Sequence, residues 1–223
     1  AQFDKVIAQF PTSRYADDAL FQSANIDLEK GNYQAAIRAY TRLVKDKPRS
    51  YLIPPALLKR ALAYNNIQVF EEAIRDYKRI LSEYSDAPAA KEAMLGLQAT
   101  LENAGRMEEM SDVLADYKKK NPQSTETERI EFETAKGLYG DGKYPQAIKA
   151  LQNYIRDYPN SKSATEARYL GGESYYRNND LANALKLFNI VMGEGDEKFT
   201  PKAALRAGDI EVQQQNFPQA VRN

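Results

Sequence analysis

Residues 33–37, Tyr33-Gln34-Ala35-Ala36-Ile37, decide the fold because their pattern returns along the chain at an almost constant interval. The pattern is a large apolar residue, an alanine three positions later and then an aliphatic residue. Further copies begin at Phe70, Tyr144, Leu181 and Phe217, and a degenerate copy begins at Met107. Successive copies start 37, 37, 37, 37 and 36 residues apart. A period of this length indicates an array of structurally equivalent repeats.

A second series with the same period supports this interpretation. Proline followed two residues later by serine occurs as Pro11-x-Ser13, Pro48-x-Ser50, Pro122-x-Ser124 and Pro159-x-Ser161. These prolines are separated by 37 residues or by twice 37, and Ser85 occupies the remaining position. Because two unrelated patterns share one period, the repeat is not an accident of composition.

Each repeat predicts two helices. The first follows Pro-x-Ser and ends at a turn marked by Gly31, Gly105, Gly142 or Asn178-Asn179-Asp180. The second begins at the large apolar residue and ends before the next Pro-x-Ser. We expect the serine of each Pro-x-Ser to be the N-cap of the following helix. The other prolines fall in predicted first helical turns, where the missing N–H costs nothing.

Some local patterns invite a chemical interpretation but are better explained by helix structure. Paired carboxylates, as glycosidases use, occur at Asp17-Asp18, Glu71-Glu72 and Glu108-Glu109. All lie in predicted first turns, where the helix dipole favours negative charge. Gly171 and Gly172 fall inside a predicted helix, at and beside the small-residue position, so we expect close packing there rather than a phosphate-binding loop.

A single helix pair of this length cannot bury enough apolar surface to fold alone, so it must pack against its neighbours. The sequence therefore predicts an all-α protein, an α-solenoid of stacked antiparallel helix pairs with a 37-residue repeat. We expect one array over residues 1–223, with a partial repeat at 1–12, a truncated repeat at 198–223, and full repeats at 13–49, 50–86, 87–123, 124–160 and 161–197. Neither end carries a polar cap, so a fragment of a longer protein is expected.

The third repeat departs from the pattern. Gln98 replaces the small residue of the first helix, Met107 replaces the large apolar residue, and Met110 replaces the alanine. Methionine adapts to irregular space, so we expect less regular packing there. Two explanations remain open: neutral drift in a tolerant array, or a local change in the curvature of the superhelix.

The composition restricts the chemistry available to the chain. It has no cysteine and no histidine, and its 31 Lys+Arg residues balance 31 Asp+Glu residues. Thiolate nucleophiles, zinc–sulfur sites and histidine bases are therefore excluded. The balanced charge gives no electrostatic basis for binding nucleic acid. We expect no catalytic site, no cofactor and no metal.

At this point the sequence resembles the tetratricopeptide repeat (TPR) family. The family consensus is matched by Leu20, Ala24, Ala36, Tyr40 and Pro48, and again by Leu57, Ala61, Tyr64, Ala73 and Tyr77. The repeat is 37 residues long instead of the usual 34. This longer repeat is similar to the TPR subgroup of bacterial envelope proteins, which includes outer-membrane assembly lipoproteins and Tol–Pal accessory proteins.

The resemblance implies that the first helix of each pair lines a concave groove that binds a protein or peptide. Tyr and Arg residues typically contribute most of the binding free energy of an interface. We nevertheless expect about half of the tyrosines at the predicted groove positions to pack between repeats. Binding of a chaperone's C-terminal carboxylate, as in one TPR subgroup, is disfavoured. The groove positions that hold lysine in that subgroup hold apolar residues in this sequence. The groove residues that the register predicts are Phe21, Asn25, Asn65, Arg129, Phe132, Lys136, Tyr139, Tyr169, Glu173, Tyr176 and Arg177.

The favoured function is therefore a non-catalytic protein–protein interaction scaffold, in bacterial envelope assembly by resemblance. An alternative is an accessory helical superstructure of an envelope enzyme whose catalytic domain lies outside this chain. An RNA reader is a third hypothesis, which the neutral charge disfavours. The resemblance places the chain in the periplasm or cell envelope, with a cytoplasmic location as the alternative. We expect no membrane insertion by these residues and a lipid anchor, if one exists, outside them.

Overall fold

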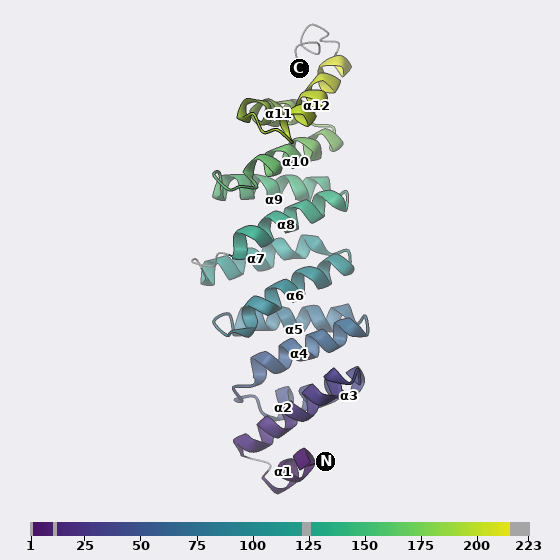
Figure 1. Ribbon diagram of the computed structural model, residues 1–223, viewed down its shortest axis with the longest axis vertical. Helices are drawn as coiled ribbons and strands as arrows, with labels where there is room; N and C mark the ends of the chain where they lie inside the picture. Colours follow the sequence, from purple (N-terminus) through teal and green to yellow (C-terminus); the bar gives the residue numbers. More distant parts are fainter. Residues whose placement is uncertain (1, 11–12, 122–125, 215–223) are drawn as a thin grey trace. The chain divides into compact units, whose positions relative to one another are not determined.

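A computed structural model describes residues 2–10, 13–121 and 126–214, and all regular structure in these ranges is helical. The chain forms two compact units, residues 1–123 and 124–223. Each unit is an all-α solenoid of antiparallel helix pairs, which confirms the predicted fold class (Figure 1). No helix in the described ranges has the length and apolar character needed to cross a membrane.

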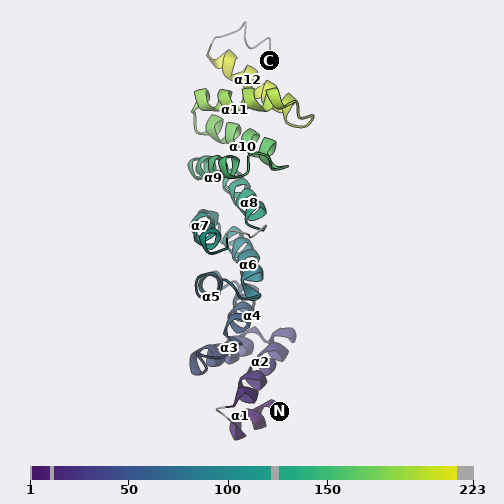
Figure 2. The same cartoon turned by 90° about the vertical axis from the view of Figure 1, so that its left-hand side faces the viewer.

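The first unit begins with the short helix α1 and continues with helix pairs. Its helices are α1 (Gln2–Gln9), α2 (Arg14–Glu29), α3 (Tyr33–Asp46), α4 (Ile53–Asn66), α5 (Phe70–Glu83), α6 (Ala89–Asn103), the short 3₁₀ helix η1 (Met107–Glu109) and α7 (Met110–Lys120). Each helix contacts the next, and α4 also contacts α2 and α6. The first helices α2, α4 and α6 thus form one layer, and the second helices α3, α5 and α7 form the other (Figure 2).

The second unit repeats this arrangement. Its helices are α8 (Glu126–Gly140), α9 (Tyr144–Asp157), α10 (Ala164–Arg177), α11 (Leu181–Glu194) and α12 (Thr200–Gln213). Consecutive helices pack together, and the first helices α8 and α10 contact each other directly. The predicted copy at Phe217, together with Pro218, lies outside the described residues, as do Pro11, Pro122 and Ser124.

The second helices start where the sequence predicts. Tyr33, Phe70, Tyr144 and Leu181 are the first residues of α3, α5, α9 and α11. In the third repeat Met107 instead begins the 3₁₀ turn η1, and the α-helix starts only at Met110. The expected irregularity of this repeat is therefore seen as a tightened first turn, in which both methionines are buried.

The turn that separates the two helices of a repeat has one recurring conformation. Gly31, Gly105 and Gly142 have φ of 75°, 65° and 73°, and Asn179 and Gln68 have φ of 60° and 59°. Each lies in the left-handed region that terminates helices, and the next residue donates its N–H to a carbonyl five positions earlier. Gln68 is the unexpected member, because a side chain makes this conformation costly, by roughly 1–2 kcal/mol.

The prediction that each Pro-x-Ser serine caps a helix is correct only in part. Ser13 is the N-cap of α2, and its hydroxyl accepts the N–H of Ala16 at 3.2 Å. The prediction is wrong for Ser50 and Ser161. Both close a separate turn before the helix, and each hydroxyl accepts the backbone N–H two residues later, at 3.4 and 3.1 Å. Helices α4 and α10 consequently begin three residues after these serines.

Small residues and rings interlock at the interfaces between the paired helices. Ala24, Ala61 and Ala135 are fully buried. A Cβ atom on Gly172 would lie 2.6 Å from Cε1 of Phe188, so this glycine admits the phenyl ring. The predicted packing role of Gly172 is thus confirmed.

Burial of Tyr77 predicts a change in stability at alkaline pH. This tyrosine has no exposed surface, and burial raises its pKa from 10.0 to about 12. The unfolded chain therefore loses the phenolic proton at lower pH than the folded chain, so stability present below pH 10 is lost as the pH rises toward 12. Between these values, the free energy of unfolding of the wild type should fall by about 2 kcal/mol more than that of Tyr77→Phe. Urea unfolding at a series of pH values measures this, and parallel curves would contradict it.

Candidate functional site

The predicted groove residues of the first unit join helices within the chain. The ring of Phe21 packs against Tyr40, with centroids 5.9 Å apart, and the Tyr40 hydroxyl donates to Asn25 Oδ1 at 2.6 Å. The Asn65 amide donates to Thr100 Oγ1 at 2.8 Å and to the Tyr77 hydroxyl at 3.3 Å. Asn25 therefore links α2 to α3, and Asn65 links α4 to α5 and α6.

In the second unit the predicted residues converge on one buried carboxylate. The Glu173 side chain on α10 is 3% exposed, and Arg206 Nε on α12 lies 2.5 Å from its Oε1. The Tyr169 hydroxyl donates to Oε1 at 3.3 Å, and the Tyr139 hydroxyl of α8 donates to Oε2 at 3.5 Å. This carboxylate cluster links α8, α10 and α12, so Glu173 is held inside the chain rather than presented to solvent.

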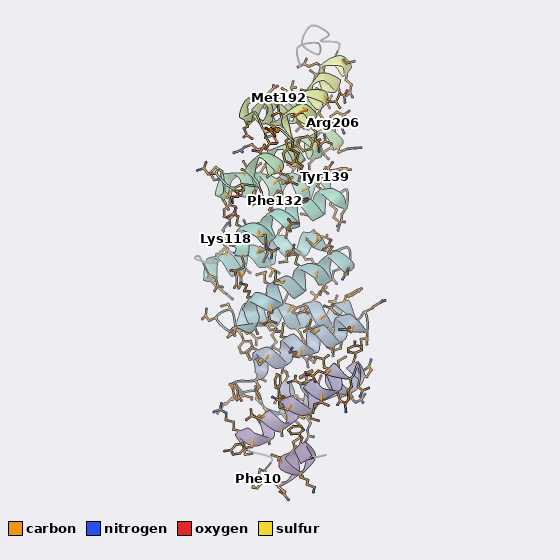
Figure 3. All side chains as sticks on the ribbon, in the orientation of Figure 1. Phe10, Lys118, Phe132, Tyr139, Met192 and Arg206 are labelled. Atoms are coloured by element: carbon orange, nitrogen blue, oxygen red, sulfur yellow. The ribbon has the colours of Figure 1, made fainter. Side chains whose placement is uncertain are left out.

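Tyr176 extends the carboxylate cluster toward the surface. The guanidinium carbon of Arg206 lies 5.3 Å from its ring centroid, and the Gln213 amide donates to its hydroxyl at 3.0 Å. Arg177 is exposed at the end of α10, where its positive charge suits the helix dipole. The rim of the carboxylate cluster is therefore aromatic and cationic. Figure 3 labels two members of the cluster, Tyr139 and Arg206.

Burial keeps the phenols of the carboxylate cluster protonated. It raises the pKa of Tyr169 to about 12, and the negative charge of Glu173 acts in the same direction. The pKa of Tyr139 is also raised, mainly by burial. The hydrogen bond from Arg206 to Glu173 raises the pKa of the guanidinium. At neutral pH the tyrosines thus remain hydrogen-bond donors to the carboxylate.

Arg206 was missed by the sequence interpretation, although the repeat itself could have located it. Position 206 lies 37 residues after Tyr169, which makes it the equivalent groove position of the next repeat. Gln213 stands in the same relation to Tyr176. Extending the register by one period would therefore have identified both residues.

An open cleft of about 670 Å³ lies between α8 and α10. We refer to it as the α8–α10 cleft; its lining includes Glu128, Arg129, Phe132, Lys136, Lys162 and Glu166. The predicted residues Arg129, Phe132 and Lys136 therefore share one surface, whereas Lys162 and Glu166 were not foreseen.

Phe132 and Lys136 give the α8–α10 cleft an apolar wall beside a fixed charge. Phe132 is buried and packs against Tyr154, with ring centroids 5.2 Å apart. Lys136 Nζ lies 3.1 Å from Glu166 Oε1, and this contact raises the lysine pKa. Arg129 and Lys162 are exposed at the edge of the cleft.

Contacts inside the chain also engage the carboxylate of Glu128. It accepts a hydrogen bond from the Ser161 hydroxyl at 2.6 Å, and that hydroxyl also bonds to Tyr154. Within the described residues no group of three or more Asp or Glu side chains is placed to hold a metal ion. The α8–α10 cleft therefore offers a ring, hydroxyls and cations, which are groups suited to recognition.

Comparison with known families places this architecture in a class. A tetratricopeptide repeat model matches residues 21–88. The crystal structure of MamA matches with a TM-score of 0.50 and 19% identity, covering 88% of this chain and 94% of that one. The chain therefore has the fold of a tetratricopeptide repeat protein, a fold that generally serves as a protein–protein interaction scaffold.

A finer resemblance concerns the middle of the chain. The YfiO model, described as an outer membrane lipoprotein, matches residues 98–187. This chain thus has the tetratricopeptide repeat fold and resembles the outer membrane lipoprotein type over those residues. No curated protein matches the sequence.

Other solved structures are similar at lower scores. A tetratricopeptide repeat protein from Parabacteroides merdae matches with a TM-score of 0.48 and 17% identity, covering 98% of this chain and 80% of that one. YrrB, described as a TPR protein with an unusual peptide-binding site, matches with a TM-score of 0.48 and 15% identity, covering 100% and 97%.

Proposed function

We propose that this chain is a non-catalytic scaffold that binds a peptide segment or partner domain on the first-helix layer of its second unit. The observation that carries the proposal is the α8–α10 cleft, which combines an aromatic wall with exposed cations. Its volume of about 670 Å³ is sufficient for several side chains of a partner. Tyr139, Tyr169 and Tyr176 continue the same layer and supply the residue type that commonly anchors interfaces.

The lining of the α8–α10 cleft holds three cations and three carboxylates, so its preference for an acidic partner depends on which of them are engaged within the chain. Glu128 and Glu166 have partners within the chain, which reduces their repulsion of an incoming anion, whereas Glu133 is exposed and acts on Lys136. Arg129 and Lys162 remain exposed at the rim and can form charge-assisted hydrogen bonds. We infer that an acidic segment with an apolar side chain directed at Phe132 is the best match.

We also propose that the protein acts in the bacterial cell envelope. The support is the match of residues 98–187 to the outer membrane lipoprotein model. Fractionation of cells that express the full-length protein tests this location, and recovery in the cytoplasm would contradict it.

Photo-crosslinking in cells tests the binding surface. A photoreactive phenylalanine analogue replacing Arg129 or Lys162 should give one discrete adduct with the same partner, because both positions border the α8–α10 cleft. The analogue at Gln34, an exposed position of α3, should not give that adduct. Adducts of equal yield from all positions would contradict binding in the cleft.

Charge reversal should then weaken binding of the crosslinked partner. Arg129→Glu combined with Lys162→Glu is expected to raise the Kd by at least about tenfold, since two charge-assisted contacts are lost. Arg38→Glu, at an exposed arginine of α3, is the matched control and should leave the Kd within about twofold. Titration by isothermal calorimetry measures these values. Equal weakening by the control would place the effect outside the cleft.

A further inference from the structure

The opposite face of the second unit carries an apolar groove. It has a volume of about 510 Å³ and lies between the second helices α9 and α11, with α10 below them. Ile148 and Ile155 line it from α9, and Leu187 and Ile190 line it from α11. We refer to it as the α9–α11 groove. It belongs to the second-helix layer and is separate from the α8–α10 cleft.

The repeat provides an internal comparison for this groove. The positions equivalent to Ile190 in earlier repeats hold polar or charged residues, namely Lys5, Arg42, Arg79, Asp116 and Asn153. Ile190 is nevertheless 49% exposed. An exposed isoleucine at a position that the other repeats keep polar is not required by the fold.

The equivalent groove of the first unit has a different character. It lies between α5 and α7, has a volume of about 480 Å³, and its lining includes Lys78, Arg79, Glu83, Asp116 and Lys120. The lining of the first-unit groove also includes Leu81 and Val113, which are equivalent to Ile155 and Leu187, so both grooves have apolar walls. The α9–α11 groove differs in Ile190, where the first-unit groove has Asp116.

Polar groups at the base of the α9–α11 groove already have hydrogen-bond partners within the chain. The Gln152 amide donates to the Tyr175 hydroxyl, so these polar groups have partners without a ligand. Gly171 adds no side chain to the floor, and a Cβ atom there would lie 3.0 Å from Leu187 Cδ1. An apolar occupant can therefore rest on the floor without leaving a buried polar group unpaired.

The walls of the groove determine the conformation of an occupant. Both walls are α-helices, whose backbone groups are hydrogen-bonded within each helix. An extended segment would find no backbone partners there, whereas a helix satisfies its own. Docking of an amphipathic helix is the recognition mode that this geometry permits.

The charges that line the groove indicate which residues should lie beside the apolar face of the docked helix. Arg156 and Lys186 line the groove, and no carboxylate lines it among the described residues, although Arg156 Nε also lies 2.9 Å from Asp157 Oδ1 beside the groove. We propose that the α9–α11 groove docks an amphipathic helix of a partner protein, with aliphatic side chains on its buried face and carboxylates on both sides of that face. This inference does not depend on the proposed function of the α8–α10 cleft.

Fluorescence anisotropy with designed peptides tests the proposal on the 223-residue chain. The probe is a fluorescein-labelled helix of about 15 residues with leucines at i, i+3, i+4 and i+7 and glutamates beside them. The control peptide has lysines in place of the glutamates. The glutamate peptide should bind at least about tenfold more tightly than the lysine peptide.

Variants of the chain assign the binding to the groove. Ile190→Asp should weaken binding of the glutamate peptide by at least about tenfold, and the fold tolerates this residue type because Asp116 holds the equivalent position. Leu205→Asp alters another exposed apolar residue, on α12, and should leave the affinity unchanged. Circular dichroism establishes that both variants are folded.

Three results of the peptide titrations would overturn the proposal: absence of binding, equal binding of the two peptides, or full binding by Ile190→Asp. Self-association of the chain that Ile190→Asp abolishes, measured by analytical ultracentrifugation, would assign the groove to a second copy and would also overturn it. Because the variants that test the α8–α10 cleft lie on the other layer, failure here leaves the proposed function intact.

Discussion

Replacing Arg206 with leucine is expected to lower the free energy of unfolding of the second unit by about 3 kcal/mol. The change leaves the carboxylate of Glu173, which is 3% exposed, without its cationic partner. Only the hydroxyls of Tyr169 and Tyr139, at 3.3 and 3.5 Å, would remain to stabilise the negative charge. Native-state hydrogen exchange of the α10 amides measures the loss.

Matched variants distinguish this effect from a general effect of removing arginine. Adding Glu173→Gln to Arg206→Leu should recover most of the loss, since no buried charge remains. Arg42→Leu breaks an ion pair with Asp46 whose side chains are 59% and 50% exposed, so it should cost at most about 0.5 kcal/mol. A cost for Arg206→Leu no greater than that for Arg42→Leu would show that the carboxylate cluster does not stabilise the unit.

Replacing Phe188 with alanine is expected to cost about 4 kcal/mol, the largest effect of the series. Phe188 is fully buried, and its ring fills the space left open by Gly172. Removal of the ring leaves a cavity between α10 and α11 that rigid helices can close only in part. Urea unfolding followed by circular dichroism measures the cost.

Gly172→Ala provides the test of this explanation. In the wild type the new methyl group would lie 2.6 Å from the ring of Phe188, and overpacking should cost about 1–3 kcal/mol. In the Phe188→Ala background the same methyl group enters the cavity, so the change should be neutral or stabilising. Additive costs would contradict the proposed contact between these residues.

The fold could be predicted from the sequence because the repeat supplies each feature several times. Tyr33, Phe70, Tyr144 and Leu181 begin their helices as expected. The failures are local: Ser50 and Ser161 close turns of their own, and a capping preference cannot distinguish a turn from the helix that follows it. The turn at Gln68 adopts the same conformation as the glycine turns, although its residue type gives no such signal.

The register predicts which residues share a surface, but it does not predict the contacts that they make. The register placed Arg129, Phe132 and Lys136 on one surface, and they line one cleft. It could not show that Asn25 and Asn65 bond to neighbouring helices, because that depends on side-chain reach across the interface. The environment of Glu173 depends on Arg206, which lies on another helix and is distant in sequence.

The left-handed turns at residues 31, 68, 105, 142 and 179 are separated by 37 residues. Each junction between paired helices in the described residues is thus built from the same local geometry. Duplication or deletion of one 37-residue repeat would join the end of one repeat to the start of another, as in the existing chain. Each remaining turn between paired helices would stay intact. A change in the number of repeats therefore requires no new turn geometry between the helices of a pair.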